Sequence, residues 1–461
     1  MQMSALTISI RDAYAGMRGK LRWLSDRLVI LLGDIRQDSK NTIAVLDGVR
    51  AFACLFVIIY HINRTFGENP FIWSIPSYPL STSIVTAGAT GVVLFFVLSG
   101  FLLFMPYAKA LLFDAPWPSA RVFYLRRALR ILPGYYVALF VLILLSHPEY
   151  LHRDHLKDLL LFLTFFMDSS PHTYQQINGP FWTLGTEWQF YMLLPLLAFG
   201  LGFILRRISL QRRLPALISC LLGIMVYGMA VRYYGFYLQL HPTQAFLGHR
   251  SLTNIVMFFL FGVQGKYLEV FAIGMLVGAC YTYAKHAPAG SNFMIRARQL
   301  SLWLWGCGLV LLVFTTMWHF SIDHNQYRGW PQGYLGWPFL SFLAPWYDRL
   351  YPFCVATGYG TCVAAILFGS VELKRLFEWR LLRWVGFISY GLYIWHLPLL
   401  LYLHDHILPH LHLSIRTSYS LYWAWALFII IPFATLCYIV IERPWMRLGD
   451  RWRKRLSVGA Q

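Results

Sequence analysis

The stretch that decides the fold is Ile43–Ile62, IAVLDGVRAFACLFVIIYHI, which is apolar except at a few positions. A helix of this length rises about 30 Å, the hydrocarbon thickness of a bilayer. Arg50 and His61 lie within it, on one helix face and roughly 16 Å apart. Because a cation in a membrane span is costly, the pair predicts a site that holds an anion toward one membrane face and handles a proton toward the other. Taken alone, Arg50 snorkelling to lipid phosphate beside an idle interfacial His61 explains the pattern equally well.

The rest of the chain has the composition of a membrane protein. It is 58% hydrophobic and only 13% charged, whereas soluble domains carry roughly a quarter charged residues. Apolar runs of about twenty residues, rather than ten-residue alternation, predict an all-α polytopic helix bundle. We predict ten transmembrane helices, near residues 43–62, 85–107, 131–147, 187–205, 214–234, 267–285, 300–318, 350–368, 385–403 and 420–441.

The net charge of +19 follows this topology and does not indicate nucleic acid binding. With the N-terminus in the cytoplasm, 29 of the 39 Lys and Arg residues fall in inner segments and 9 in outer loops, and Arg50 is the remaining one. This positive-inside bias predicts a multi-pass protein of the cell inner membrane with both termini cytoplasmic. A crossing at 156–167 would move four arginines outside, so we predict that 156–167 and 252–263 are re-entrant or interfacial.

The chain ends differ from the predicted transmembrane domain, 43–445. Residues 1–42 place leucines at helical spacing beside Arg and Lys, which predicts an amphipathic helix on the cytoplasmic leaflet. Residues 446–461 form a basic cytoplasmic tail. His406 and His410 have the i,i+4 spacing of metal ligands, but an outer loop between two spans explains them as well, and we predict no metal site.

A cluster of arginines precedes the third predicted span. Arg126, Arg127 and Arg130 recur at helical spacing, and a cluster of guanidinium groups suits phosphates. An ordinary positive-inside anchor would explain the same residues.

Two further segments keep polar groups where lipid disfavours them. Glu187 enters the outer end of the fourth predicted span, with Tyr191 on the same face. Ser389, Tyr393 and His396 follow at i, i+4 and i+7, and this polar stripe should line an internal cavity. Spacing does not decide whether that cavity serves chemistry or transport.

Six strings occur in a characteristic order: LDGVRAFACLFVIIYH (46–61), GVVLFFVLSGFLL (91–103), YLRRALRILPGYY (124–136), FWTLGTEWQFYMLLPLL (181–197), GFISYGLYIWHLPLL (386–400) and IERP (441–444). Together they resemble the membrane acyltransferase-3 family over about 400 residues. The resemblance implies transfer of an acyl group, most often acetyl, from cytoplasmic acyl-CoA to a hydroxyl of an extracytoplasmic glycan or other envelope molecule. It implies acyl-CoA as a donor substrate and no permanently bound cofactor.

The resemblance also implies roles for particular residues. The family's Arg-x10-His motif corresponds to Arg50 and His61, its arginine motif to Arg127 and Arg130, and its glutamate to Glu187. His61 is then expected to be the general base, oriented by Glu187. The arginines, with Arg126 beside them, are expected to bind the phosphates of coenzyme A.

The polar stripe has two interpretations on this basis. Ser389, Tyr393 and His396 either hold the acceptor and stabilise an oxyanion, or pack polar atoms between helices. The aromatic-rich segment 319–349 either shapes the acceptor site or is a plain interfacial loop.

The chain departs from the family in two respects. Thr183 and Gly185 stand where serines are usual near the glutamate, so a hydroxyl role at 185 is not expected. Some relatives carry a hydrolase-like domain after the last span, whereas this chain ends shortly after Glu442. Any such second step therefore either needs a separate extracytoplasmic acyltransferase partner or is absent. A transporter or flippase of a glycan or lipid-linked precursor is the alternative function.

Overall fold

The computed structural model describes residues 43–66, 84–245, 249–287, 292–325 and 342–458. Every regular element in these ranges is helical, and ten helical segments there are long and apolar enough to cross a membrane. Each of the ten predicted spans overlaps one of them, so the predicted all-α polytopic bundle is confirmed. The amphipathic helix predicted at 1–42 lies outside the described residues, as does most of the predicted aromatic-rich segment 319–349.

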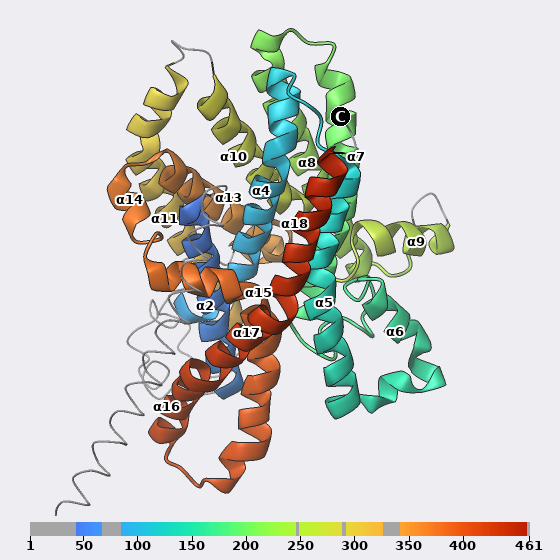
Figure 1. Ribbon diagram of the computed structural model, residues 1–461. Coiled ribbons are helices and arrows are strands. Elements are labelled where there is room, and N and C mark those ends of the chain that lie inside the picture. Colours follow the sequence, from blue (N-terminus) through green and yellow to red (C-terminus); the bar gives the residue numbers. More distant parts are fainter. Residues whose placement is uncertain (1–42, 67–83, 246–248, 288–291, 326–341, 459–461) are drawn as a thin grey trace, which may run out of the picture.

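The long helices run side by side in Figure 1. Nine of the spans are built on α2 (Ala44–Phe66), α4 (Gly91–Phe113), α5 (Ala120–Ser146), α7 (Phe181–Leu205), α8 (Arg213–Leu240), α10 (Leu268–His286), α11 (Phe293–Asn325), α13 (Tyr347–Phe368) and α15 (Arg380–Tyr402). The tenth joins α16 (Ile415–Trp425), α17 (Ile431–Cys437) and α18 (Arg443–Val458) through two π-helical turns, Ala426–Ile430 and Tyr438–Glu442. Most of the predicted basic tail therefore continues the last span as helix.

Three short helices complete the described chain: α6 (Leu156–Leu163), α9 (Arg250–Leu260) and α14 (Val371–Arg375). At about 1.5 Å per residue, α6 and α9 are far too short to cross a bilayer, as predicted for 156–167 and 252–263. Both lie beside the bundle in Figure 1. The hydroxyls of Tyr135 and Tyr136 on α5 donate to the last carbonyls of α6, each at 2.8 Å, which fixes this short helix.

Glycine brings α4 and α10 into close contact. A Cβ on Gly274 would overlap the carbonyl of Val97, and a Cβ on Gly100 would overlap the carbonyl of Phe271. Without side chains at these positions the two backbones approach closely, which is how small residues associate helices in lipid. The same pair of helices carries the rings of Phe96 and Phe271, whose centroids are 4.9 Å apart.

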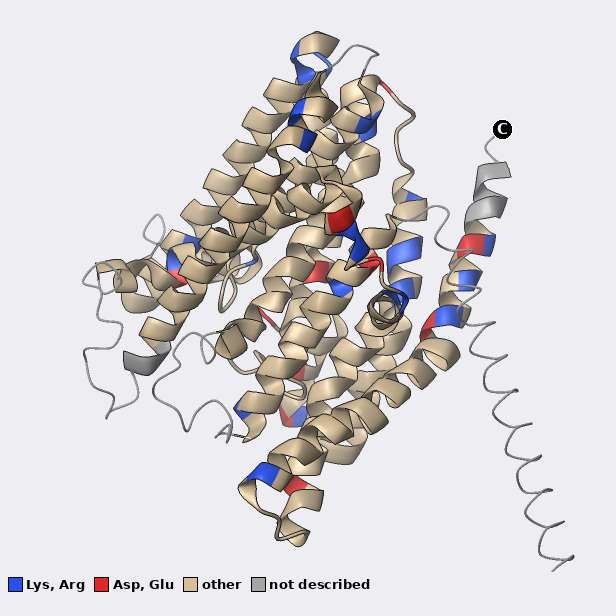
Figure 2. Cartoon of the chain, turned by 90° about the vertical axis from the view of Figure 1, so that its left-hand side faces the viewer, with Lys and Arg blue, Asp and Glu red and all other residues tan. Residues whose placement is uncertain are grey.

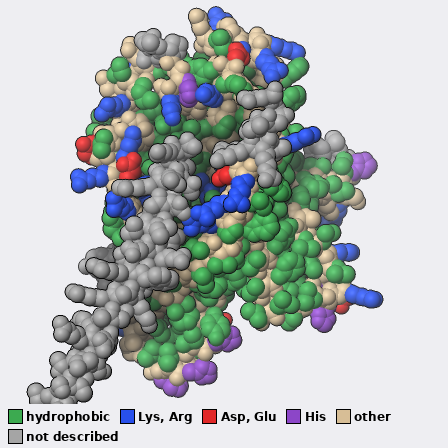
Figure 3. Space-filling view, viewed as in Figure 1, with side chains coloured by type: hydrophobic (Ala, Val, Ile, Leu, Met, Phe, Trp, Pro, Cys, Tyr) green, Lys and Arg blue, Asp and Glu red, His purple; other side chains and the backbone are tan. Residues whose placement is uncertain are grey.

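Charged residues are concentrated at helix ends and in a group within the bundle, and long stretches of helix carry none (Figure 2). Figure 3 shows a wide hydrophobic surface on one face, interrupted by patches of Lys and Arg. One interpretation needs correction. Arg232 is one of the nine cations counted in outer loops, but α8 continues to Leu240 and buries Arg232 against Glu269 at 2.7 Å.

A loop-to-helix hydrogen bond anchors the start of α7. Pro398 has no N–H, so the carbonyl of Ile394 lacks its usual partner one turn later in α15. Asn178 Nδ2 donates to that carbonyl at 2.8 Å. The segment before α7 is therefore held against α15, and the polar faces of both helices are brought together.

Candidate functional site

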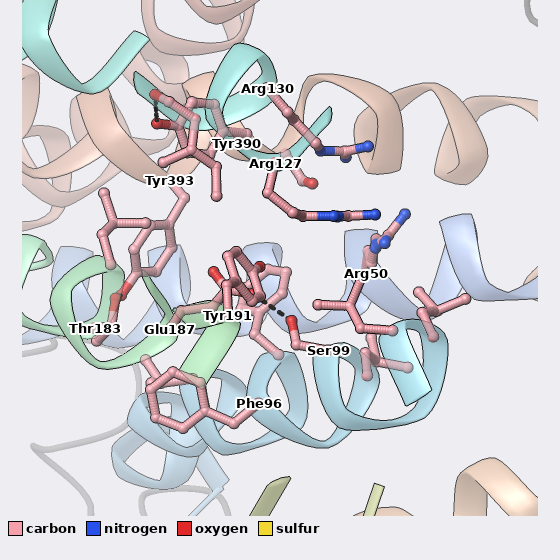
Figure 4. A pocket seen from close by; sticks show the side chains of 18 residues that line it. Arg50, Phe96, Ser99, Arg127, Arg130, Thr183, Glu187, Tyr191, Tyr390 and Tyr393 are labelled. Carbon is pink, nitrogen blue, oxygen red and sulfur yellow. Dashed lines mark hydrogen bonds between the residues drawn. The ribbon is translucent and has the colours of Figure 1, made fainter. Parts of the chain in front are cut away.

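A cavity lies between α2, α4, α5, α7 and α15 (Figure 4). The polar residues that line it are Arg50, Ser99, Arg127, Arg130, Thr183, Glu187, Tyr191, Ser389, Tyr390 and Tyr393. Five helices from distant parts of the sequence thus contribute to one site. Six of the nine predicted site residues are among these lining residues.

One end of the cavity is cationic. Arg50, Arg127 and Arg130 point to the same side in Figure 4. Asp47 on α2 is buried and offsets part of this charge, 3.9 Å from Arg50 and 3.5 Å from Arg383. Guanidinium groups gathered in a low-dielectric site repel one another, so the arrangement is suited to an anionic ligand such as a phosphate.

The carboxylate of Glu187, on α7, also lines the cavity. Thr183, Glu187 and Tyr191 recur every four residues on one face of α7. Ser99 Oγ donates a hydrogen bond to Glu187 Oε1, and the guanidinium of Arg127 lies 5.8 Å from the centre of the Tyr191 ring. The sequence signal for Ser99 is a single hydroxyl within the apolar run of α4, which does not by itself predict a partner.

His61 lies behind this cavity, in contact with another histidine. His396 Nε2 is 3.2 Å from His61 Nδ1, and their ring centroids are 4.9 Å apart. Tyr393 connects the pair to the cavity, because its ring is 5.8 Å from His396 and its hydroxyl is 2.8 Å from that of Thr183. The predicted polar stripe on α15 is indeed buried, with Ser389 and Tyr393 at the cavity and His396 beside it.

The backbone around the histidines determines their neutral tautomers. His396 Nδ1 faces the carbonyls of Tyr393 at 2.7 Å and Leu392 at 3.2 Å, and a carbonyl can only accept. His396 Nδ1 therefore carries the proton, and its Nε2 is an acceptor. His61 Nδ1 faces this acceptor and the carbonyl of Val57 at 3.0 Å, so it too is an N–H. The lone pair of neutral His61 is then on Nε2, the nitrogen a general base would use.

Two predicted contacts differ from the structure. Among the described residues no hydrogen bond joins Glu187 to His61; Glu187 pairs with Ser99, and His396 occupies the position expected for an orienting carboxylate. Arg126 is exposed on α5 and does not line the cavity, although it lies one helical turn before Arg130.

A buried carboxylate missed as a site residue lies near the cationic end. Glu442 ends the π-helical turn Tyr438–Glu442, is 4% exposed, and packs against Gly391 of α15. The Arg130 guanidinium is close enough to act electrostatically on this carboxyl. The string IERP marked the position in the sequence, but spacing alone did not connect it to Arg130, more than 300 residues earlier.

Known proteins resemble the chain over most of its length. YrhL of Bacillus subtilis (strain 168), provisionally named a peptidoglycan O-acetyltransferase, is 27% identical over 374 residues, covering 77% of this chain and 48% of YrhL. Peptidoglycan O-acetyltransferase OatA of Listeria monocytogenes is 22% identical over 381 residues, covering 78% of this chain and 50% of OatA. The chain thus spans about half the length of these curated relatives. No solved structure is significantly similar to it.

The strongest of these comparisons is with a family. The model of the family described as "Acyltransferase domain", acyltransferase-3, matches residues 43–442, from the start of α2 to Glu442. The match includes all five helices that enclose the cavity, and the His61–His396 pair behind it. The chain is a multi-pass membrane protein that belongs to the acyltransferase-3 family.

Proposed function

We propose that the protein is a membrane O-acyltransferase, which moves an acyl group, acetyl in the first instance, from cytoplasmic acyl-CoA to a hydroxyl of an extracytoplasmic envelope glycan. The observation that carries this proposal is the convergence of Arg50, Arg127 and Arg130 at one end of a cavity whose other end meets the His61–His396 pair through Tyr393. An anion-binding end and a base at the opposite end are what a thioester donor and a hydroxyl acceptor require.

The three arginines would bind the phosphates of coenzyme A. Guanidinium groups form charge-assisted, often bidentate hydrogen bonds to phosphate oxygens. Bound there, the donor would extend its pantetheine arm along the cavity, past Glu187, toward Tyr393. The names of the relatives support acetyl as the acyl group and a peptidoglycan hydroxyl as a first acceptor to test.

His61 would act as the general base. Its Nε2 takes the proton of the acceptor hydroxyl as the oxygen attacks the thioester carbonyl. The C–O bond forms, the tetrahedral oxyanion collapses, and the C–S bond breaks. The proton on His61 then passes to the departing thiolate, so that an O-acyl ester and free coenzyme A are the products. The hydroxyl of Tyr393, which is hydrogen-bonded to that of Thr183, would donate a hydrogen bond to the oxyanion.

The decisive experiment replaces the base. Purified protein in proteoliposomes is given radiolabelled acetyl-CoA and a peptidoglycan acceptor, and label in the ester product is counted. We expect His61→Ala and His61→Gln to lower transfer by about 10²-fold or more while the affinity for acetyl-CoA stays within about twofold. Transfer near the wild-type rate in both variants would remove His61 from the reaction. Absence of transfer by the wild type to any envelope glycan would overturn the proposed function itself.

A further inference from the structure

A second cavity of about 650 Å³ lies between α7 and α8, away from the arginine cluster. Its volume is in the range of sites for drug-sized ligands. Leucines of α7 and apolar residues of α8 line it, and Phe259 and Leu260 at the end of α9 close one part. Leu193, Tyr227 and Phe259 are exposed on it, so the cavity is a groove open to the surface of the bundle.

The groove runs along the membrane-spanning parts of both helices. On α7 it extends from Thr186 to Ile204, which at about 1.5 Å per residue is roughly 27 Å. This is close to the ~30 Å thickness of a bilayer core. In lipid, an open groove with apolar walls is filled by hydrocarbon, and its narrow, elongated course along one helix pair fits a single long chain.

One end of the groove is polar. Arg232 is 2% exposed and donates to Glu269, yet its Nη2 is buried without a hydrogen-bond acceptor among the described residues. Lys266, which also lines the groove, donates to Asp168 at 2.8 Å. A buried cation in a span, as Arg232 is on α8, marks a functional position. A guanidinium donor without an acceptor and an ammonium that line the same groove are suited to a phosphate at the end of the hydrocarbon chain.

This polar end adjoins the catalytic cavity. Thr186 and Gln189 line the groove from α7, on either side of Glu187. The ring of Trp182 lies 5.6 Å from Tyr267 of the groove and 6.4 Å from Phe96 of the catalytic cavity. A head group held at Arg232 and Lys266 would therefore be separated from the acyl-transfer site by one layer of aromatic side chains.

We propose that the groove between α7 and α8 binds the hydrocarbon chain of a lipid phosphate that carries the acceptor glycan. The substrate class of the proposed function is then a lipid-linked glycan, with the phosphate on Arg232 and Lys266 and the sugar hydroxyls directed to the catalytic cavity. The inference rests on the proposed function for its catalytic consequence, whereas the lipid site itself is independently testable.

The structure supplies a substitution that fills the groove and a matched control. Gly223 on α8 lines the groove, and a Cβ there meets no atom within 4 Å, so Gly223→Phe places a ring in the groove without a clash at the backbone. Gly200 on α7 is equally unobstructed but does not line the groove, so Gly200→Phe adds the same ring at a lipid-facing position.

The first measurement is photolabelling in proteoliposomes with a polyprenyl phosphate that carries a diazirine on its chain. We expect label on groove residues of α7 and α8, reduced about tenfold by Gly223→Phe and unchanged by Gly200→Phe. A phospholipid bearing the same diazirine controls for general lipid contact and should label all exposed helices in all three proteins. Equal polyprenyl labelling in Gly223→Phe and wild type, or labelling spread over all spans, would overturn the site.

The second measurement separates the site from the function. Transfer from radiolabelled acetyl-CoA is compared for a polyprenyl-linked peptidoglycan precursor and for the same glycan phosphate without its chain. Gly223→Phe should raise KM for the chain-bearing acceptor about tenfold and leave KM for acetyl-CoA unchanged. Equal use of both acceptors by the wild type would overturn the lipid-linked acceptor while leaving O-acyl transfer intact. Groove labelling without transfer to either acceptor would instead retain the lipid site and overturn the catalytic role.

Discussion

His396 Nε2 lies 3.2 Å from His61 Nδ1, although 335 positions separate the two residues in the chain. Close packing of α15 on α2 creates this contact. A Cβ on Gly386 of α15 would overlap the carbonyl of Asp47 on α2, so the helices meet backbone to backbone near one end. We interpret His396 as a positioning residue. Its Nε2 accepts a hydrogen bond from the Nδ1–H of His61, which leaves Nε2 of His61 as the basic nitrogen.

The tautomer assignment predicts different outcomes for two substitutions of His396. His396→Ala removes one of the two acceptors of the His61 Nδ1–H, the other being the Val57 carbonyl, and should lower kcat about tenfold or more with KM for acetyl-CoA unchanged. His396→Gln offers an amide oxygen to the same N–H and should recover part of that loss. Steady-state kinetics of the two purified variants test this, with matched thermal unfolding as the control for folding. Equal losses in both variants, or a loss confined to KM, would contradict a positioning role.

Substitution of the cavity arginines should change KM for acetyl-CoA more than substitution of their exposed neighbour, Arg126. We expect Arg127→Ala and Arg130→Ala each to raise KM for acetyl-CoA about tenfold or more, because each loses a charge-assisted phosphate contact. Arg→Lys at either position should restore activity only in part, since an ammonium cannot form the bidentate contact. Arg126→Ala is the control and should change KM less than threefold, because Arg126 does not line the cavity. Equal effects at all three positions would indicate a topology anchor instead.

The hydrogen bond between Ser99 and Glu187 should be measurable as a coupling free energy in a double-mutant cycle. Glu187→Gln removes the negative charge from the cavity wall. We expect a loss of kcat of about 10²-fold, because the electrostatic contribution of this carboxylate to the reaction is lost. Ser99→Ala should cost about tenfold through the lost hydrogen bond to a charged group. In a double-mutant cycle the two losses should not add, because both act through one carboxylate. Additive losses would show that the two residues act independently.

Close helix packing predicts which glycines the fold requires. Gly274→Leu should destabilise the protein by about 2 kcal/mol or more, because its side chain would have to displace the carbonyl of Val97 on α4. Gly306→Leu on α11 is the control, since a Cβ there meets nothing within 4 Å. Thermal unfolding in detergent should show a drop of roughly 5 °C or more for the first and little change for the second. Equal midpoints would contradict the close contact of α4 and α10.

The sequence predicted the fold because lipid imposes a single strong rule on it. A span needs about twenty apolar residues, and α2 satisfies this with Arg50 and His61 still visible as exceptions. The residues at which the helices end could be predicted less well. α8 continues past its predicted end at 234 to Leu240, and the charge of Arg232 within it is neutralised by Glu269 from another helix.

The site was predictable only where its residues share one helix face. Helical periodicity joined Glu187 with Tyr191 and Ser389 with Tyr393, and all four line the cavity. Contacts between helices carry no such signal. The partners Ser99 of Glu187 and His396 of His61 depend on how α4 meets α7 and how α15 meets α2, and one sequence does not specify those pairings.

The orientation of the bundle in the membrane is the last testable prediction, and the direction of acyl transfer depends on it. His172 and Leu210 lie beyond opposite ends of α7, whose 25 residues rise about 37 Å, so they should be on opposite sides of the membrane. In a variant without native cysteines, Leu210→Cys should react with an impermeant maleimide only after the membrane is opened. His172→Cys and His412→Cys should react from outside.

The positive-inside bias motivates this orientation. Arg127 and Arg130 lie in the half of α5 that is predicted to be cytoplasmic, where acyl-CoA is available. Labelling of His172→Cys from the cytoplasmic side alone would invert the bundle. The arginine end of the cavity would then be turned away from the cytoplasm, and binding of cytoplasmic acyl-CoA by Arg50, Arg127 and Arg130 would be ruled out.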